Sequence, residues 1–202
     1  MKTDNKENGD LRPVSTKGTN RRGLGTMPFF LYLRVMEEIN RKLNFLLANL
    51  QVQRANLQAA HWNLRGCHSF IPIHKYLGEL YEANSEHIDM VAELIRIHDG
   101  TPFTTFSRYL RRATIQEIVE AEMMEADAVL KKAYNDNTFV LSGAKEIFKE
   151  TGEMADVNDY MALMVADYGK RQWFIKSSIS KPMGMAQEAT TPVKEEEEVV
   201  ED

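Results

Sequence analysis

This sequence has a single cysteine, Cys67, so it can form neither a disulfide within the chain nor a zinc or iron–sulfur site built on cysteines. A lone cysteine suits a reducing compartment, and we expect a cytoplasmic protein. Long apolar runs are also missing. The longest one near the N-terminus, MPFFLYL, is far too short to cross a membrane, and nothing in MKTDNKENGD resembles a secretory signal. We therefore expect no membrane partner.

Apolar residues are scarce at both ends of the chain, although the whole is 43% hydrophobic with a net charge of −5. Residues 1–26 predict a disordered basic tail, and residues 182–202, which include VKEEEEVVED, predict a disordered acidic one. The stretch between them, 27–181, is long enough for one folded domain. The basic side chains of the first tail are Lys2, Lys6, Arg12, Lys17, Arg21 and Arg22.

The central stretch has the periodicity of helices rather than strands. A first amphipathic stripe begins after Met36, and a second helix is expected between Pro72 and HDGTP. A third helical pattern begins near Ile115, but NDNTFVLSG interrupts it, and the sequence alone leaves open whether that helix ends there. A last helix is predicted over 156–178. Four long helices, with a long crossover between the second and third that carries a short helix, predict an all-α, ferritin-like four-helix bundle. The first stripe comprises Ile39, Leu43, Leu46, Leu50 and Leu57.

Histidine is confined to residues 61–98, where the second helix also carries a row of acids on the face opposite its apolar one. A solvated charged face explains such a row without any metal. The histidines favour another interpretation, because His61 returns to within about 20° of the buried azimuth of Leu50. His74 then begins the helix that bears Asp89 and Glu93. Imidazole with carboxylate, and no thiolate, suits iron, manganese or zinc. The acidic row comprises Glu79, Glu82, Glu86, Asp89 and Glu93.

The spacing of these candidate ligands restricts how they can meet. His74 and Asp89 lie 15 residues apart, which is about 22 Å on a straight helix, so one chain cannot bring them to one ion. A second copy related by a two-fold axis could bring its Asp89 and Glu93 beside His74. The Glu-x-x-His motif of ordinary ferritins is absent, and so is the His-Glu-x-x-His of zinc proteases.

These residues resemble the Dps family, the bacterial miniferritins that protect DNA in starved cells. The match lies in HWNLRG, in His74 and in HIDMVAEL, and weaker similarity extends over residues 33–180, through DGTPFTTFSRYL to GKRQWFIKSSI. The resemblance implies a dodecameric shell with ferroxidase sites between two-fold-related subunits. His61 and His74 would come from one subunit, and Asp89 and Glu93 from its partner. There Fe(II) is oxidised by peroxide or O₂, and Fe(III) mineral collects inside.

Two departures from the family pattern concern the candidate site. The family usually has an aspartate four residues after the second histidine, where this chain has Gly78, and the loop between the two histidines is one residue longer. The site could bind its first iron with fewer carboxylates, or it could borrow Glu79 or His68. The alternative is a nucleoid-binding, Dps-like shell with impaired or absent ferroxidase activity.

Three further features have a plain explanation beside a functional one. Trp62 fills a subunit interface or, as in similar proteins, is oxidised in place of DNA. Glu79 forms part of a hydrophilic wall or binds metal and seeds mineral. The negative charges of Asp156 and Asp159 stabilise the N-terminus of the last helix by interacting with its dipole. The resemblance adds that acids here line a pore that admits Fe(II).

The basic N-terminal tail is the candidate contact for DNA, because flexible lysines and arginines neutralise phosphates without reading sequence, and many copies add avidity. Against this, twelve chains at −5 each sum to about −60. Three hypotheses follow. The chain forms an iron-oxidising and iron-storing shell, a nucleoid-binding shell, or a plain helical oligomer without a metal role.

Overall fold

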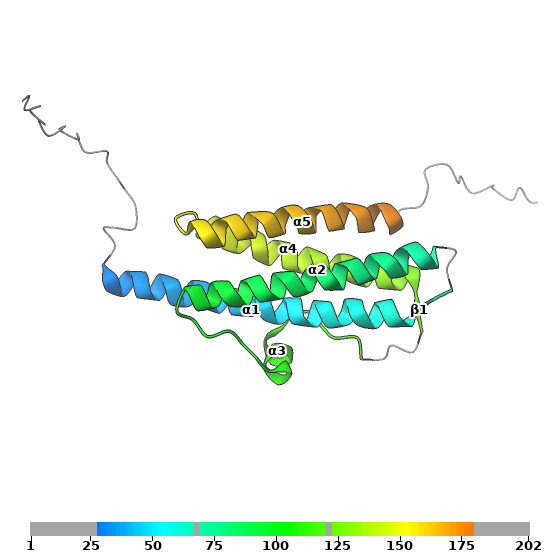
Figure 1. The fold of residues 1–202 in the computed structure, drawn as a ribbon, viewed down its shortest axis with the longest axis horizontal. Coiled ribbons are helices and arrows are strands. Elements are labelled where there is room, and N and C mark those ends of the chain that lie inside the picture. The colour runs from blue at the N-terminus through cyan, green and yellow to red at the C-terminus, as the bar shows by residue number, and fades with distance from the viewer. Residues whose placement is uncertain (1–27, 67–68, 120–122, 180–202) are drawn as a thin grey trace, which may run out of the picture.

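Five helices and two very short strands make up the described part of the chain, residues 28–66, 69–119 and 123–179 of a computed structural model. The two predicted tails and His68 lie outside these residues. Figure 1 shows the four long helices side by side, with the short α3 set apart on the connection from α2 to α4. The predicted all-α bundle is confirmed. The elements in order are α1 (Phe29–Asn63), β1 (Leu64–Arg65), α2 (Phe70–Ile97), α3 (Phe106–Arg112), β2 (Met124–Glu125), α4 (Ala126–Glu150) and α5 (Ala155–Ile179).

The apolar stripes of the long helices meet along the bundle axis, where α1 packs on α2 and α4 on α5. Leu43 and Leu50 of the predicted stripe are fully buried, as is Met161 of the last helix. At one end of the bundle, β1 and β2 pair in parallel, which ties the end of α1 to the start of α4. No described helix is both long and apolar enough to span a membrane.

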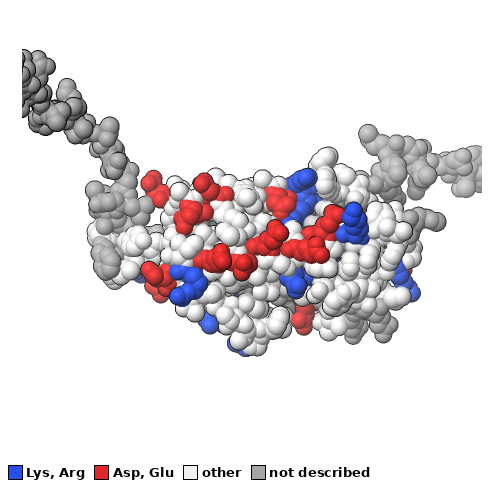
Figure 2. Space-filling view, viewed as in Figure 1, with Lys and Arg blue, Asp and Glu red and all other residues white. Residues whose placement is uncertain are grey.

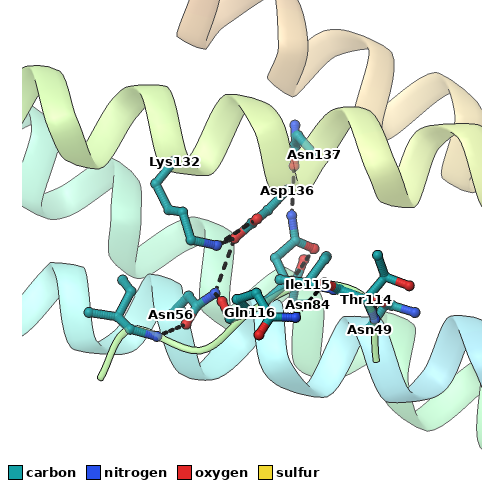
Figure 3. A network of polar contacts seen from close by, with 11 residues as sticks. Asn49, Asn56, Asn84, Thr114, Ile115, Gln116, Lys132, Asp136 and Asn137 are labelled. Atoms are coloured by element: carbon teal, nitrogen blue, oxygen red, sulfur yellow. Dashed lines mark hydrogen bonds and ion pairs between the residues drawn. The ribbon is translucent and has the colours of Figure 1, made fainter. Parts of the chain in front are cut away.

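Asparagines on α1 hold the long connection against the bundle, as Figure 3 shows for Asn49 and Asn56. The Asn49 Oδ1 accepts hydrogen bonds from the backbone N–H groups of Thr114 and Ile115, at 2.9 and 3.0 Å. The Asn56 Oδ1 accepts one from Ile118 at 2.9 Å, and its Nδ2 donates to the Gln116 carbonyl at 2.9 Å. Side chains therefore satisfy the backbone here without a helix or a sheet.

The prediction of a helix from about Ile115 is wrong, because α4 begins only at Ala126. The backbone N–H groups of Ile115 and Ile118 are bound by side chains of α1 instead, and only some of the apolar residues here reach the core: Ile115 is buried, whereas Val119 is exposed. The question left open at NDNTFVLSG is also decided, since α4 continues through it to Glu150. Asp136 and Asn137 are polar there because they form buried hydrogen bonds with Asn56 and Gln53 of α1, not because the helix breaks.

Candidate metal centre

His61, in the last turn of α1, and His74, near the start of α2, hold each other in a reciprocal clamp. The Nδ1 of His61 lies 2.8 Å from the carbonyl oxygen of His74, and the Nδ1 of His74 lies 2.9 Å from the carbonyl oxygen of His61. A carbonyl oxygen can only accept, so each Nδ1 carries a proton and donates it. In the neutral rings, Nε2 is then the bare nitrogen that can bind a metal.

Both Nε2 atoms are available for a ligand. No hydrogen bond from either nitrogen to another described residue is formed. The rings themselves are half-buried, and they are flanked by Phe70, which stacks on His74, and by Tyr81, whose ring meets His61 edge-on. The clamp and these rings fix the direction of both donors, as a metal site requires.

The two imidazoles are stacked, with ring centroids 3.8 Å apart and planes at 20°. The lone pair of Nε2 lies in the plane of its ring, and a bond from imidazole to a transition metal spans about 2.1 Å. Two nearly parallel planes do not meet within that distance, so His61 and His74 cannot share one ion in this conformation. Each could offer its nitrogen only to a separate ion, and two adjacent ion positions would be the basis of a two-metal site.

Gly78 lies one helical turn after His74 and directly beneath the ring of His61. A β-carbon placed there would lie 3.4 Å from Cε1 and 3.6 Å from Nδ1 of His61, which is ordinary van der Waals contact. Glycine is therefore not required at this position, and a side chain could be accommodated. As it stands, this turn of α2 gives the histidine pair no carboxylate.

Asp89 and Glu93 are exposed on the same helix, well away from the histidine pair. Because α2 is continuous from Phe70 to Ile97, the helical rise puts Asp89 about 22 Å from His74. Figure 2 shows the acidic side chains as a nearly continuous row along α2. Basic side chains lie only toward the two ends of this row. Within the described residues, no three histidine, cysteine or acidic side chains gather around a common point. The acids could complete the histidine site only from another chain.

Trp62 and Glu79, the secondary candidates near the pair, both face solvent in the single chain. The Trp62 side chain is 68% exposed, which leaves its interface and redox interpretations open. The carboxylate of Glu79 lies 3.8 Å from the ammonium of Lys75, one turn back on the exposed face.

The interior of the bundle, where ordinary ferritins bind two metals, is filled in this chain by amides, a phenol and a guanidinium. Asn84 and His87 occupy the spacing of the missing Glu-x-x-His motif. The Tyr168 hydroxyl lies 2.9 Å from both Gln53 Oε1 and Asn84 Oδ1, and burial raises the pKa of Tyr168, so that it stays protonated. The fixed positive charge of Arg171, 2.5 Å from Asn84 Oδ1, opposes any cation here. Any metal centre of this chain must therefore lie outside the bundle interior.

We expect Tyr168→Phe to lower the free energy of unfolding by about 1–2 kcal/mol per chain, because two buried amides lose a partner. Chemical unfolding at one fixed protein concentration would measure it. The matched control is Tyr134→Phe, a half-buried tyrosine on α4. Equal stability of the two variants would show that the interior network contributes nothing at this point.

His87 extends the interior network to Asp167 and Tyr160 on α5. Its Nε2 lies 2.8 Å from Asp167 Oδ2, and its Nδ1 lies 2.9 Å from the Tyr160 hydroxyl. Burial alone would raise the pKa of the Asp167 carboxyl, but the hydrogen bond with His87 and the charge of Arg171 outweigh it and lower that pKa. His87 has no role predicted from the sequence, although its position three residues after Asn84 is visible there.

The predicted pore acids lie at the opposite end of the bundle from the histidine pair. Asp156 is in the first turn of α5, and both it and Asp159 are exposed. The Asp156 Oδ2 lies 2.9 Å from Nε2 of His98, a partner that the sequence does not predict. This contact joins the end of α2 to the start of α5.

Comparisons with known proteins agree with this architecture. The family model of the ferritin-like domain matches residues 40–183. The "DNA protection during starvation protein" of Porphyromonas gingivalis is 32% identical over 141 residues, which are 69% of this chain and 87% of that protein. The protein with the same description from Listeria innocua is 28% identical over 145 residues, covering 69% and 90% of the two chains.

Solved structures show the same fold. The Dps protein of Vibrio cholerae, described as one of a broad superfamily of ferritin-like diiron-carboxylate proteins, superimposes with a TM-score of 0.68. It is 26% identical, over 73% of this chain and 92% of that one. Dps from Staphylococcus aureus gives a TM-score of 0.66 at 25% identity, over 72% and 97% of the two chains.

Proposed function

Because this chain belongs to the ferritin-like Dps family, we propose that it assembles into a dodecameric shell in the cytoplasm, which oxidises Fe(II) and stores Fe(III). The observation that carries this proposal is the clamp of His61 and His74. It holds two stacked imidazoles with both Nε2 atoms ready to bind a transition metal.

The oxygen ligands in this proposal are Asp89 and Glu93 of a two-fold-related subunit. They lie one helical turn apart and are exposed, so both can reach a neighbouring chain. Their negative charge would lower the cost of binding Fe(II) and would stabilise the Fe(III) that forms. The interior of the bundle supports an inter-subunit location, because its carboxylates are already paired. Asp136 is bound by Lys132, and Asp167 is bound by His87 and Arg171.

Hydrogen peroxide or O₂ is the electron acceptor in this proposal. Two ferrous ions side by side can give both electrons that one peroxide needs to become water, so no hydroxyl radical is released. The iron enters as substrate, through pores lined by Asp156 and Asp159, whose charge would concentrate cations. Glu79 and its exposed neighbours on α2 would bind the oxidised product as mineral begins to form.

Oxidation of Fe(II) tests this function directly. We expect anaerobic protein, loaded with two ferrous ions at each of the two sites of a two-fold interface, to form ferric iron after peroxide addition much faster than a protein-free solution does. Ferric absorbance follows the rate, and a spin trap reports hydroxyl radical. A rate equal to that of free iron would reject the enzyme and leave a shell without ferroxidase activity.

DNA binding through the N-terminal tail is the second proposal, which the names of the curated relatives favour. We expect the full chain to retard DNA in a gel at low salt and less at high salt, because phosphate contacts release counterions. A chain without residues 1–25 should lose that retardation, and so should a full-length chain with the tail's lysines and arginines changed to glutamine. Retardation that survives both changes would place the DNA contact outside the tail.

A further inference from the structure

A tyrosine, a histidine and a carboxylate form one hydrogen-bonded chain between α2 and α5. The Tyr160 hydroxyl contacts Nδ1 of His87 at 2.9 Å, and Nε2 of His87 contacts Asp167 at 2.8 Å. Arg171 lies 2.5 Å from the same carboxylate oxygen of Asp167. His87 is buried, and Tyr160 packs half-buried against the main hydrophobic core. Neither the proposed iron oxidation nor DNA binding requires this chain of groups.

The positions of the protons follow from what each group can do. A carboxylate only accepts, so Nε2 of His87 carries a proton and donates it to Asp167. In the neutral ring, Nδ1 is then an acceptor, and the Tyr160 hydroxyl donates to it. This is the arrangement in which a phenol can lose its proton to a base without moving, while a fixed negative charge stabilises the imidazolium that forms.

We propose that Tyr160 is a redox-active tyrosine, which gives one electron to an oxidant at the two-fold iron site while its phenol proton passes to His87. Asp167 acts as a positioning residue, because it holds the histidine in the required tautomer and balances its charge. The inference rests on the proposed iron oxidation, since that reaction supplies the oxidant, hydrogen peroxide.

The hydrogen-bonded chain of Tyr160, His87 and Asp167 is called the relay below. It matters when a site holds one ferrous ion rather than two. Gly78 leaves the ion position at His74 without a carboxylate from its own helix, which favours single occupancy. One peroxide then needs two electrons and two protons to become two water molecules, and one ferrous ion supplies only one electron. Tyr160 supplies the second and becomes a neutral phenoxyl radical, its own proton goes to His87 Nδ1, and solvent supplies the two protons for water. The next ferrous ion returns the electron, and His87 returns the proton.

The location of the relay fits this role. His87 precedes the proposed ligand Asp89 by two residues, so their α-carbons are about 5 Å apart, on opposite sides of α2. The electron therefore crosses one helix. Trp62 is a competing donor, but it is 68% exposed in the single chain and has no comparable base hydrogen-bonded to it.

Freeze-quench electron paramagnetic resonance (EPR) on the assembled full-length protein tests the proposal. With one ferrous ion at each of the two sites of a two-fold interface and an excess of peroxide, we expect the EPR signal of a tyrosyl radical. This signal should narrow when the tyrosines carry ring deuterium, which separates it from the signal of a tryptophan radical. The signal should fall at least tenfold in Tyr160→Phe and persist in the matched control Tyr134→Phe. Asp167→Asn keeps the phenol but should lower the radical yield, whereas a purely structural Asp167 would leave that yield unchanged.

A second, iron-free experiment separates this inference from the function on which it rests. Flash photolysis of a ruthenium tris-bipyridine oxidant should produce the same Tyr160 radical, with slower formation in D₂O because the proton moves with the electron. If this radical forms but the protein does not oxidise iron, the relay is supported and the iron function fails. If no Tyr160-dependent signal appears on photolysis, or if iron is oxidised at single occupancy without one, the proposal is overturned.

Discussion

Two inactive variants of this protein should restore iron oxidation when they are assembled together. The first variant, His61→Ala with His74→Ala, lacks both nitrogen ligands, and the second, Asp89→Ala with Glu93→Ala, lacks both oxygen ligands. Each alone should oxidise Fe(II) at least tenfold more slowly than the unmodified protein, because every site loses one half of its ligands. Ferric absorbance after peroxide addition measures all three rates.

The recovery follows from the symmetry of a two-fold interface. In a mixed pair, one site combines the intact histidines of one chain with the intact carboxylates of the other, and the second site has lost all four ligands. Random co-assembly of equal amounts makes half of the pairs mixed, so about a quarter of all sites should be intact. The mixed shells should therefore recover about a quarter of the unmodified rate.

The control is co-assembly of the histidine variant with a differently tagged copy of itself, which should recover nothing. Native mass spectrometry of the tagged chains verifies that the two variants have mixed. Mixed shells that stay as slow as their parents would mean that each site draws its ligands from one chain. The 22 Å between His74 and Asp89 would then have to be closed by a large change in α2.

The histidine pair could be anticipated from the sequence because the information is local. His61 lies on the buried stripe of the first helix, and His74 opens the second, so a short connection brings them to one end of the bundle. The clamp itself could not be anticipated, because each ring binds a backbone carbonyl of the other helix. Such contacts depend on how two helices are placed, and periodicity carries no information about that placement.

The start of α4 shows where periodicity misleads. Ile115 and Ile118 continue a helical spacing, but Asn49 and Asn56 bind the backbone beside them. Asparagine is common in loops, so the five on α1 gave no sign that the side chains of four of them bind segments some 60 residues away. Similarly, Asp136 and Asn137 resemble a helix end in the sequence, and only the buried partners Asn56 and Gln53 explain them.

The buried interior illustrates a third limit. The absence of Glu-x-x-His indicated that an ordinary ferritin centre was missing, but it did not indicate what replaced it. Gln53, Asn84 and Arg171 lie on three different helices, and their sequence positions show no common pattern. They become a unit only in the folded bundle, where each satisfies a neighbour that would otherwise be buried without a partner.

Gly78→Asp should create a second strong metal position at each two-fold site. The new β-carbon fits beside His61, and the carboxylate would lie one turn from His74, on the face that the two histidines share. A carboxylate adds negative charge where the chain now offers only neutral nitrogen, so we expect the affinity for the second divalent ion to rise tenfold or more. Isothermal titration with Zn²⁺, which is not oxidised, measures both ions without any turnover.

Two substitutions at the same position separate the possible causes. Gly78→Ala tests the space and should stabilise α2 by up to about 1 kcal/mol without changing metal affinity, because alanine is the better helix former. Gly78→Asn matches the shape of aspartate without its charge, and it should bind the second ion no better than the unmodified chain does. If asparagine and aspartate act alike, charge is not what the site lacks. If the unmodified chain already binds two Zn²⁺ ions equally tightly, Gly78 is no defect, and single occupancy cannot be the reason for an electron donor at Tyr160.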